Sequence, residues 1–452
     1  MIVFKKIFIL FLYFAYFIST GFALSVPSIY STDSLNEKRL GNKVLQSIWD
    51  SKSVIKDMES QLYIKELGQD LVNKSNQPKR HYDFFLLEDD SVNAFASWNG
   101  YVGVHDALVL FSENESELAA ILAHEISHIT QEHLKRFQEK NSKQKILTIG
   151  GVIASVLVKN SELTEAIATT TIANDLQNQI NYTREHEWEA DNSAVNILVK
   201  TDFNPDGIGS FFRRMSQSGS EKSYLRTHPL NVDRVANSQF RSEKFIKSHK
   251  SSFDYETMKI RLQISENDNR DANLVDPKID FYSKAYSSLL SRELIKASEY
   301  VEELLNINED FSSLILAGRV YGELEQVPKA EKFFESARKH RDNEVVRYFL
   351  AEMYIANNEP SKAIKLLKNF TRLNKTSVFS ETLLADAYLK ISAQDRYQFH
   401  RGNAEVLKGN HEEAIKHFNL AKNLTQNKDF FDLVDSRAKF VDEEKRILEI
   451  KD

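Results

Sequence analysis

Cysteine is absent from all 452 residues of the chain. Disulfide bonds are therefore excluded, and so is a lipid attached to a cysteine side chain. A chain of this length, expected to form two or three domains, must take its stability from hydrophobic cores. If it is exported, the lack of cysteine fits a bacterial periplasm better than an animal extracellular space. A block of basic residues is also absent and the net charge is -6, which argues against nucleic acid as a partner.

Long apolar runs are scarce, and the two that occur have different interpretations. Residues 1–23 contain two lysines, an apolar run over 7–18 and small residues that end at Ala23. This layout predicts a secretory signal peptide cleaved after Ala23; the alternative is an uncleaved membrane anchor. The second run, 146–158, is too short to span a bilayer. We interpret it as a buried or lid-forming helix, the alternative being contact with a membrane surface or a client protein.

The hydrophobic periodicity predicts a mainly α chain with a small sheet. Apolar residues three and four apart indicate helices over 26–79 and again from 107 to about 215. Between them, residues 81–87 and 100–105 look like strands. A polar, turn-rich stretch further along ends in a predicted domain linker, 261–277.

The C-terminal part of the chain repeats a spacing of 33 residues. Small residues recur at this interval, alanine follows each of them by 12 positions, and large residues share two further positions: Ala285, Gly318 and Ala351; Ala297, Ala330 and Ala363; Tyr321 and Tyr354; Phe334 and Leu367. A degenerate fourth unit is expected over 400–424, with Gly402, Ala414, Phe418 and Ala421. This is the packing pattern of tetratricopeptide (TPR) repeats, in which small residues let antiparallel helices touch. We predict a TPR-like domain over 278–446; the alternative is a helical bundle without repeats.

One predicted helix carries two histidines with the spacing of metal ligands. Ser112 and Glu115 form a capping-box signature, so the helix is expected to begin there. His124 and His128 are four residues apart and share a face, which suits two nitrogen ligands of one zinc ion. Glu125 lies one residue round the helix, where it can reach a water on the metal. The alternative is a solvated helix face with two ordinary histidines.

A catalytic zinc ion needs a third protein ligand, and a second predicted helix offers one. Residues 181–195 read as a helix with four acidic side chains: Glu185, Glu187, Glu189 and Asp191. Glu187 and Asp191 are four apart and share a face. One of them can ligate the metal while the other accepts the N–H of a metal-bound histidine. The alternative is an acidic face turned to solvent.

These two stretches, AAILAHEISHITQEH and YTREHEWEAD, resemble the metallopeptidase family that includes the CAAX prenyl-protein peptidases, HtpX and the BepA-like proteases. The family pairs His-Glu-x-x-His on one helix with Glu-x-x-x-Asp on another. The resemblance implies that His124, His128 and Glu187 hold one Zn2+ per chain. It also implies that Glu125 is the catalytic carboxylate and that Asp191 orients a zinc-bound histidine.

A third stretch, VNAFASWNGYVGVH, resembles the family's edge strand beside the active site. An extended substrate can bind a protease by adding a strand to an exposed sheet edge. We therefore expect substrate contacts at Asn93, Ala94, Phe95 and Ala96; a hairpin or core strand is the alternative.

A fourth stretch, RTHPLNVDRV, resembles the family's Thr-His-Pro motif. His228 precedes a proline and is expected on a loop, where it can reach the open metal position or a reaction oxyanion. The resemblance implies that His228 binds the metal and holds the enzyme inactive. Arg234 is expected to be a structural or oxyanion partner. His133, nine residues after His124, is expected on the far side of the same helix and outside the metal site. His105 and His186 are expected to be surface or packing residues.

The whole layout resembles the BepA-like branch: a signal peptide, a peptidase domain over 24–260, and repeats. The resemblance implies an α+β zincin-type domain followed by an α-helical TPR solenoid. It implies a periplasmic endopeptidase that assists the assembly of outer-membrane proteins and degrades unfolded or stalled ones. The repeats would then bind these clients or the outer-membrane assembly machinery. The alternative is a chaperone or adaptor whose peptidase site is latched or silent.

Overall fold

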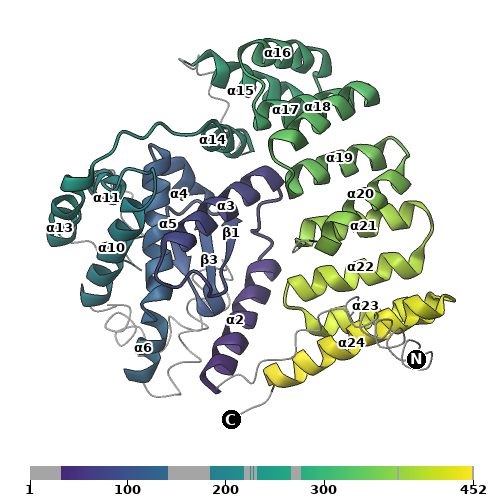
Figure 1. The fold of residues 1–452 in the computed structure, drawn as a ribbon, viewed down its shortest axis with the longest axis horizontal. Helices are drawn as coiled ribbons and strands as arrows, with labels where there is room; N and C mark the ends of the chain where they lie inside the picture. Colours follow the sequence, from purple (N-terminus) through teal and green to yellow (C-terminus); the bar gives the residue numbers. More distant parts are fainter. Residues whose placement is uncertain are drawn as a thin grey trace, which may run out of the picture.

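The computed structural model describes residues 32–140, 184–217, 224, 228, 232–265, 276–373 and 376–449. These residues form two parts, a compact N-terminal domain and an arc of paired helices that curves around one side of it (Figure 1). The predicted signal peptide and the apolar run 146–158 lie outside the described residues. Within the described ranges, no helix is long and apolar enough to cross a membrane.

The N-terminal domain is helical around a three-stranded sheet. Its elements are α2 (Thr32–Asp50), α3 (Met58–Lys74), β1 (Asp83–Leu87), β2 (Ala94–Ala96), η1 (Trp98–Gly100), β3 (Tyr101–His105), α4 (Asp106–Phe111), α5 (Glu115–Thr130), α6 (His133–Lys140), α10 (Arg184–Val199), α11 (Gly207–Gln217), α13 (Val232–Ser242), η2 (Glu243–Phe245) and α14 (Phe253–Ser265). The helical stretch expected over 26–79 is interrupted between α2 and α3, because Val54 forms an antiparallel bridge with Leu87 there.

The sheet has the strand order β1-β3-β2, with β1 parallel and β2 antiparallel to β3. Gly103, in the middle of β3, makes room for the ring of Phe95 on β2. A Cβ at this position would lie 2.1 Å from Phe95 Cε1, so no larger residue fits without moving that ring. The two predicted strands correspond to β1 and β3.

The C-terminal part is a series of antiparallel helices. They are α15 (Pro277–Leu290), α16 (Leu294–Ile307), α17 (Phe311–Glu323), α18 (Val327–His340), α19 (Glu344–Ala356), α20 (Pro360–Leu373), α21 (Val378–Lys390), α22 (Gln394–Leu407), α23 (His411–Leu424) and α24 (Lys428–Glu449). A Cβ on Gly318 would lie 2.6 Å from the ring of Phe334, and one on Gly402 equally close to that of Phe418. The same small-to-aromatic contact therefore recurs where the sequence repeats. The predicted fold class, mainly α with a small sheet followed by helical repeats, is confirmed.

The predicted start of the linker falls inside a helix. α14 continues to Ser265, and Arg261 within it is 3% exposed. The stretch looks polar in the sequence because its buried apolar residues are interspersed with polar ones: Tyr255, Met258, Ile260 and Leu262. Residues 266–275 lie outside the described ranges.

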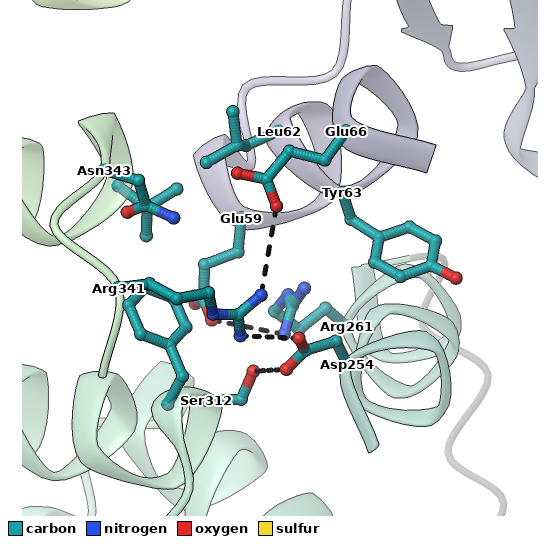
Figure 2. Close-up of a pocket in the computed structure, with 11 residues that line it drawn as sticks. Glu59, Leu62, Tyr63, Glu66, Asp254, Arg261, Ser312, Arg341 and Asn343 are labelled. Atoms are coloured by element: carbon teal, nitrogen blue, oxygen red, sulfur yellow. Dashed lines mark hydrogen bonds and ion pairs between the residues drawn. The ribbon is translucent and has the colours of Figure 1, made fainter. Parts of the chain in front are cut away.

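The arc contacts the N-terminal domain near its beginning through a buried charged network. Arg261 Nε donates to Asp57 Oδ2 and Arg261 Nη1 to the hydroxyl of Tyr282, both at 2.8 Å. A cleft lies beside this network and is lined by α3, α14 and the repeats. Its volume is about 300 Å3, including the space at its opening. Figure 2 shows Asp254 in this cleft, accepting hydrogen bonds from Ser312 and Arg341.

A second contact joins the far end of the arc to α2. Gln46 Nε2 donates to the carbonyl oxygen of Gly409 at 2.7 Å, and Asn42 Nδ2 does so at 3.3 Å. Gly409 has a φ of 78°, in the left-handed region that glycine tolerates. Trp49 on α2 also contacts Phe379, with ring centroids 6.1 Å apart. The arc therefore touches the N-terminal domain near its beginning, at α21 and near its far end.

Candidate metal centre

The helix that carries the first motif is buried on all sides. α5 runs from Glu115 to Thr130, and every residue in it is buried. Its N-cap is Asn114, whose side chain accepts from the backbone N–H of Glu117, so the expected capping box at Ser112 is wrong. Ser112 instead ends α4. Burial also excludes the alternative of a solvated helix face with two ordinary histidines.

Four buried side chains from three segments converge on one point. His124 and His128 come from α5, Glu187 from α10, and His228 from the chain before α13. One ligand atom of each lies within 4.8 Å of the others. His124 Nε2 is 3.0 Å from His128 Nε2 and 3.4 Å from His228 Nδ1. Glu187 carboxylate oxygens lie 3.2 Å from His228 Nδ1 and 3.5 Å from each Nε2 of the α5 pair.

These separations match the geometry of a tetrahedral metal. Ligand bonds of roughly 2.0–2.1 Å at tetrahedral angles place donor atoms about 3.3 Å apart, and imidazole nitrogens with a carboxylate are a preferred zinc donor set. Five of the six donor pairs span 3.0 to 3.5 Å, and all four donor atoms lie within 4.8 Å of one another. The residues present therefore fit a divalent metal ion held by three histidines and one glutamate.

A second layer of charged groups holds the donors in place. Asp191 Oδ1 lies 2.9 Å from His124 Nδ1, the ring nitrogen that faces away from the cluster. Arg234 grips Asp191 with two hydrogen bonds, each of 2.8 Å, and its Nη1 lies 2.9 Å from Glu187 Oε2. All these groups are buried. Arg234 thus offsets part of the negative charge of two buried carboxylates and is a structural partner of the site.

The local charges fix the protonation of the donors. Burial raises the pKa of Glu187, but the neighbouring histidines outweigh burial and hold it well below its usual value. Burial, together with the charges of neighbouring histidines, keeps the pKa of His128 well below its ordinary range. Burial also acts against charge on His124, yet hydrogen bonds and charges from Asp191 and Glu187 raise its pKa to about 10. Without a metal, Glu187 is therefore anionic and His128 neutral, the forms in which these side chains bind cations, whereas His124 is protonated and must release that proton when a cation binds.

Glu125 lies beside the cluster without belonging to it. Among the described residues, neither of its buried carboxylate oxygens has a hydrogen-bond partner. His228 Nε2 lies 3.4 Å from Glu125 Oε1. A buried carboxylate without a hydrogen-bond donor is costly, and such groups in native proteins often have a chemical role. Its position suits a proton acceptor next to the metal.

His133 is not one of the converging donors, as expected, but the expectation that it lies on the far side of the zinc helix is wrong. α5 ends at Thr130, and Glu132, with a φ of 53°, turns the chain so that His133 begins α6 next to His128. The two Nδ1 atoms are 2.8 Å apart. His186 stacks on His133 with ring centroids 4.5 Å apart, so it also belongs to the surroundings of the site. His105 has a different role, because its Nδ1 lies 2.9 Å from the hydroxyl oxygen of Ser91 in the loop before β2.

The predicted substrate strand lies at an edge of the sheet. Ala94–Ala96 form β2, which pairs with β3 and lies against α5. The other edge is occupied: Ile55 N–H donates to Leu86 O, and Glu88 N–H to Ser53 O. No described strand pairs with the outer side of β2. β2 and β3 also form an antiparallel hairpin, so the edge-strand interpretation and the hairpin alternative both describe this stretch and a core strand does not; the substrate contacts stay a prediction.

Comparison with known proteins agrees with this geometry. A model of peptidase family M48 matches residues 59–241. The putative beta-barrel assembly-enhancing protease of Vibrio cholerae is 30% identical over 85% of this chain and 84% of its own length. The chain belongs to peptidase family M48. The beta-barrel assembly-enhancing protease of Escherichia coli (strain K12) is 29% identical over 84% of this chain and 82% of its own.

A further relative matches a smaller share of the chain. The mitochondrial metalloendopeptidase OMA1 of Schizosaccharomyces pombe is 23% identical over 38% of this chain and 50% of its own length. The predicted resemblance to BepA-like M48 metallopeptidases is confirmed. This M48 protein is accordingly a metallopeptidase, and the cluster of three histidines and a glutamate is its candidate metal site.

Proposed function

We propose that this M48 peptidase is a zinc-dependent endopeptidase of the periplasm that acts in the quality control and assembly of outer-membrane proteins. The observation that carries the catalytic part is the convergence of His124, His128 and Glu187 beside Glu125, whose carboxylate oxygens have no hydrogen-bond partner among the described residues. The location rests on the predicted signal peptide and the absence of cysteine.

His124, His128 and Glu187 would hold the zinc ion, with His228 as a fourth, displaceable donor. When bound, zinc supplies Lewis acidity, which polarises a peptide carbonyl and lowers the pKa of water towards neutrality. Asp191 orients His124 through its Nδ1, and Arg234 offsets part of the negative charge of Asp191 and Glu187. The protein contributes the fixed geometry on which this chemistry depends.

Glu125 is the general base of the proposed reaction. Its carboxylate takes the proton of the attacking water and delivers it to the leaving amine. Because no other described group donates to its oxygens, they are available for this transfer. His228, 3.4 Å from Glu125, lies where it can hydrogen-bond the reaction oxyanion once it leaves the metal.

The substrate would bind in an extended form along β2. Adding a strand to a sheet edge uses main-chain hydrogen bonds, which suits a protease that accepts many sequences. Asn93, Ala94, Phe95 and Ala96 would supply this edge beside α5.

The repeats are the proposed binding surface for clients or for the assembly machinery. Helical repeats present an extended concave face that grips peptide segments. Two of the relatives named above are called beta-barrel assembly-enhancing proteases, which supports unfolded or stalled outer-membrane β-barrel proteins as the clients. The second candidate function is a chaperone or adaptor with a latched peptidase site. This second function is favoured by His228, because a fourth protein donor on the metal would leave no position for water.

The test is replacement of Glu125. Glu125→Gln keeps the metal donors and removes the base, so we expect cleavage of unfolded casein to fall by about 10²–10⁴-fold, with the zinc content unchanged. Glu132→Gln, at an exposed glutamate in the following turn, is the matched control and should cleave normally. A Glu125→Gln protein that still digests casein would end the proposal. A parent chain that binds unfolded clients without cutting any would favour the adaptor.

A further inference from the structure

A series of hydrogen-bonded side chains continues from the metal cluster towards the protein surface. His128 Nδ1 lies 2.8 Å from His133 Nδ1, and His133 Nε2 lies 3.1 Å from Glu189 Oε2. Arg136 holds the same carboxylate with Nη1 at 2.5 Å from Oε2 and Nη2 at 3.4 Å from Oε1. His133 is completely buried, whereas Glu189 and Arg136 are partly exposed.

The direction of the hydrogen bonds in this series is determined by its two ends, Glu189 and His128. A carboxylate only accepts hydrogen bonds, so His133 Nε2 must carry the hydrogen that faces Glu189. His133 Nδ1 then has a lone pair for His128. At the other end, a metal-ligating His128 needs the lone pair on Nε2, so its hydrogen must lie on Nδ1. The two requirements agree, because His128 Nδ1–H donates to His133 Nδ1.

We propose that His133, supported by Glu189 and Arg136, is a positioning residue that fixes the tautomer and ring orientation of His128 for metal binding. If His133 instead donated its hydrogen to His128 Nδ1, the hydrogen of His128 would lie on Nε2. It would then point into the cluster and exclude the metal. His186, stacked on His133, restricts the rotation of that ring. Asp191 performs the equivalent task for His124, so each histidine of α5 has its own partner.

This inference rests on the proposed assignment of His128 as a ligand, and its test measures zinc affinity. In the full chain carrying Glu125→Gln, zinc binding is measured by competition with a chelating dye. Loss of an outer partner of a metal ligand typically weakens affinity by about 10–100-fold, which is the expected effect of His133→Ala. His133→Asn should recover most of that loss, because the Asn amide oxygen can take the place of Nδ1 as acceptor.

His249→Ala is the matched control, because it removes another imidazole bound to a carboxylate, Glu115, away from the metal donors. It should leave zinc affinity unchanged. Equal affinities for His133→Ala and the parent would overturn the role of His133, and so would an Asn variant as weak as the Ala variant. An equal loss in His249→Ala would also overturn it, since the effect would then be general destabilisation. A parent that binds no zinc would instead overturn the proposed function.

Discussion

At the scale of single residues, His228 is the side chain proposed to close the metal site. Its Nδ1 is one of four converging donors, and a metal with four protein ligands has no position left for water. We therefore expect His228→Ala to raise the rate of casein cleavage several-fold while zinc remains bound by the other three donors.

The measurement for this prediction is the initial rate of the His228→Ala protein beside the parent, at equal zinc occupancy. A rate that falls would contradict the closed-site interpretation and would mean that His228 chiefly serves the reaction oxyanion. His81→Ala, at an exposed histidine of the same domain, provides the comparison.

The spacing of residues in the sequence predicted most of this cluster, but it misplaced His133, and the cause is local. His124 with His128, and Glu187 with Asp191, are pairs four apart, and helical geometry alone places each pair on one face. If the helix of His124 and His128 continued to His133, this residue would lie on the side of the helix away from the metal. The left-handed backbone of Glu132 breaks the helix first, and a non-glycine residue in that conformation leaves no clear sequence signal.

At the scale of elements, the edge strand depends on one glycine of its neighbour. A larger residue at Gly103 would displace the ring of Phe95 and with it β2. Overpacking of this kind costs typically about 1–3 kcal/mol, so we expect Gly103→Val to lower the free energy of unfolding by that amount and to reduce cleavage as well.

Denaturant unfolding and casein assays on the same preparation check this prediction. Gly322→Ala is the control, because its added Cβ would meet only the flexible side chain of Met353 at 3.2 Å. Unimpaired cleavage by a stable Gly103→Val protein would argue against β2 as the substrate edge.

Element boundaries were less predictable than element types. The capping box at Ser112 satisfied the sequence pattern, yet Asn114 caps α5, since both positions offer a side-chain acceptor before the same helix. In α14 the few buried apolar residues alternate with charged ones, so the helix resembled a linker. Tertiary packing against α3 and α15, which a local pattern does not contain, stabilises it.

At the scale of the whole molecule, a buried charged network connects the two parts. Arg261 is 3% exposed and lies between Asp57 and Glu59, with Tyr282 of the first repeat as a further partner. Removing one member of a buried ion pair costs about 3–5 kcal/mol because the other charge remains unpaired. We expect Arg261→Met to destabilise the chain by this amount.

Thermal or denaturant unfolding of the full chain checks this prediction. Arg292→Met removes an arginine whose ion pair with Glu323 is largely exposed, and its effect should stay within about 0.5 kcal/mol. Equal stability of the two variants would mean that the network does not hold the domains together.

The sequence repeat predicted the arc itself but not its attachment to the peptidase domain. Small residues 33 apart report contacts between neighbouring helices, which are local along the chain. The contacts of Gly409 with Asn42 and Gln46 join residues more than 360 positions apart. Such contacts depend on the curvature summed over all the repeats, and no short pattern encodes it.

The central claim is that one zinc ion is held by side chains of α5 and α10. Its most direct test is the metal content of the purified full chain by elemental mass spectrometry, beside His128→Ala and the control His249→Ala. The account predicts one zinc per chain in the parent and the control, and its loss from His128→Ala. A parent without stoichiometric zinc, or a His128→Ala protein that keeps it, would contradict the claim.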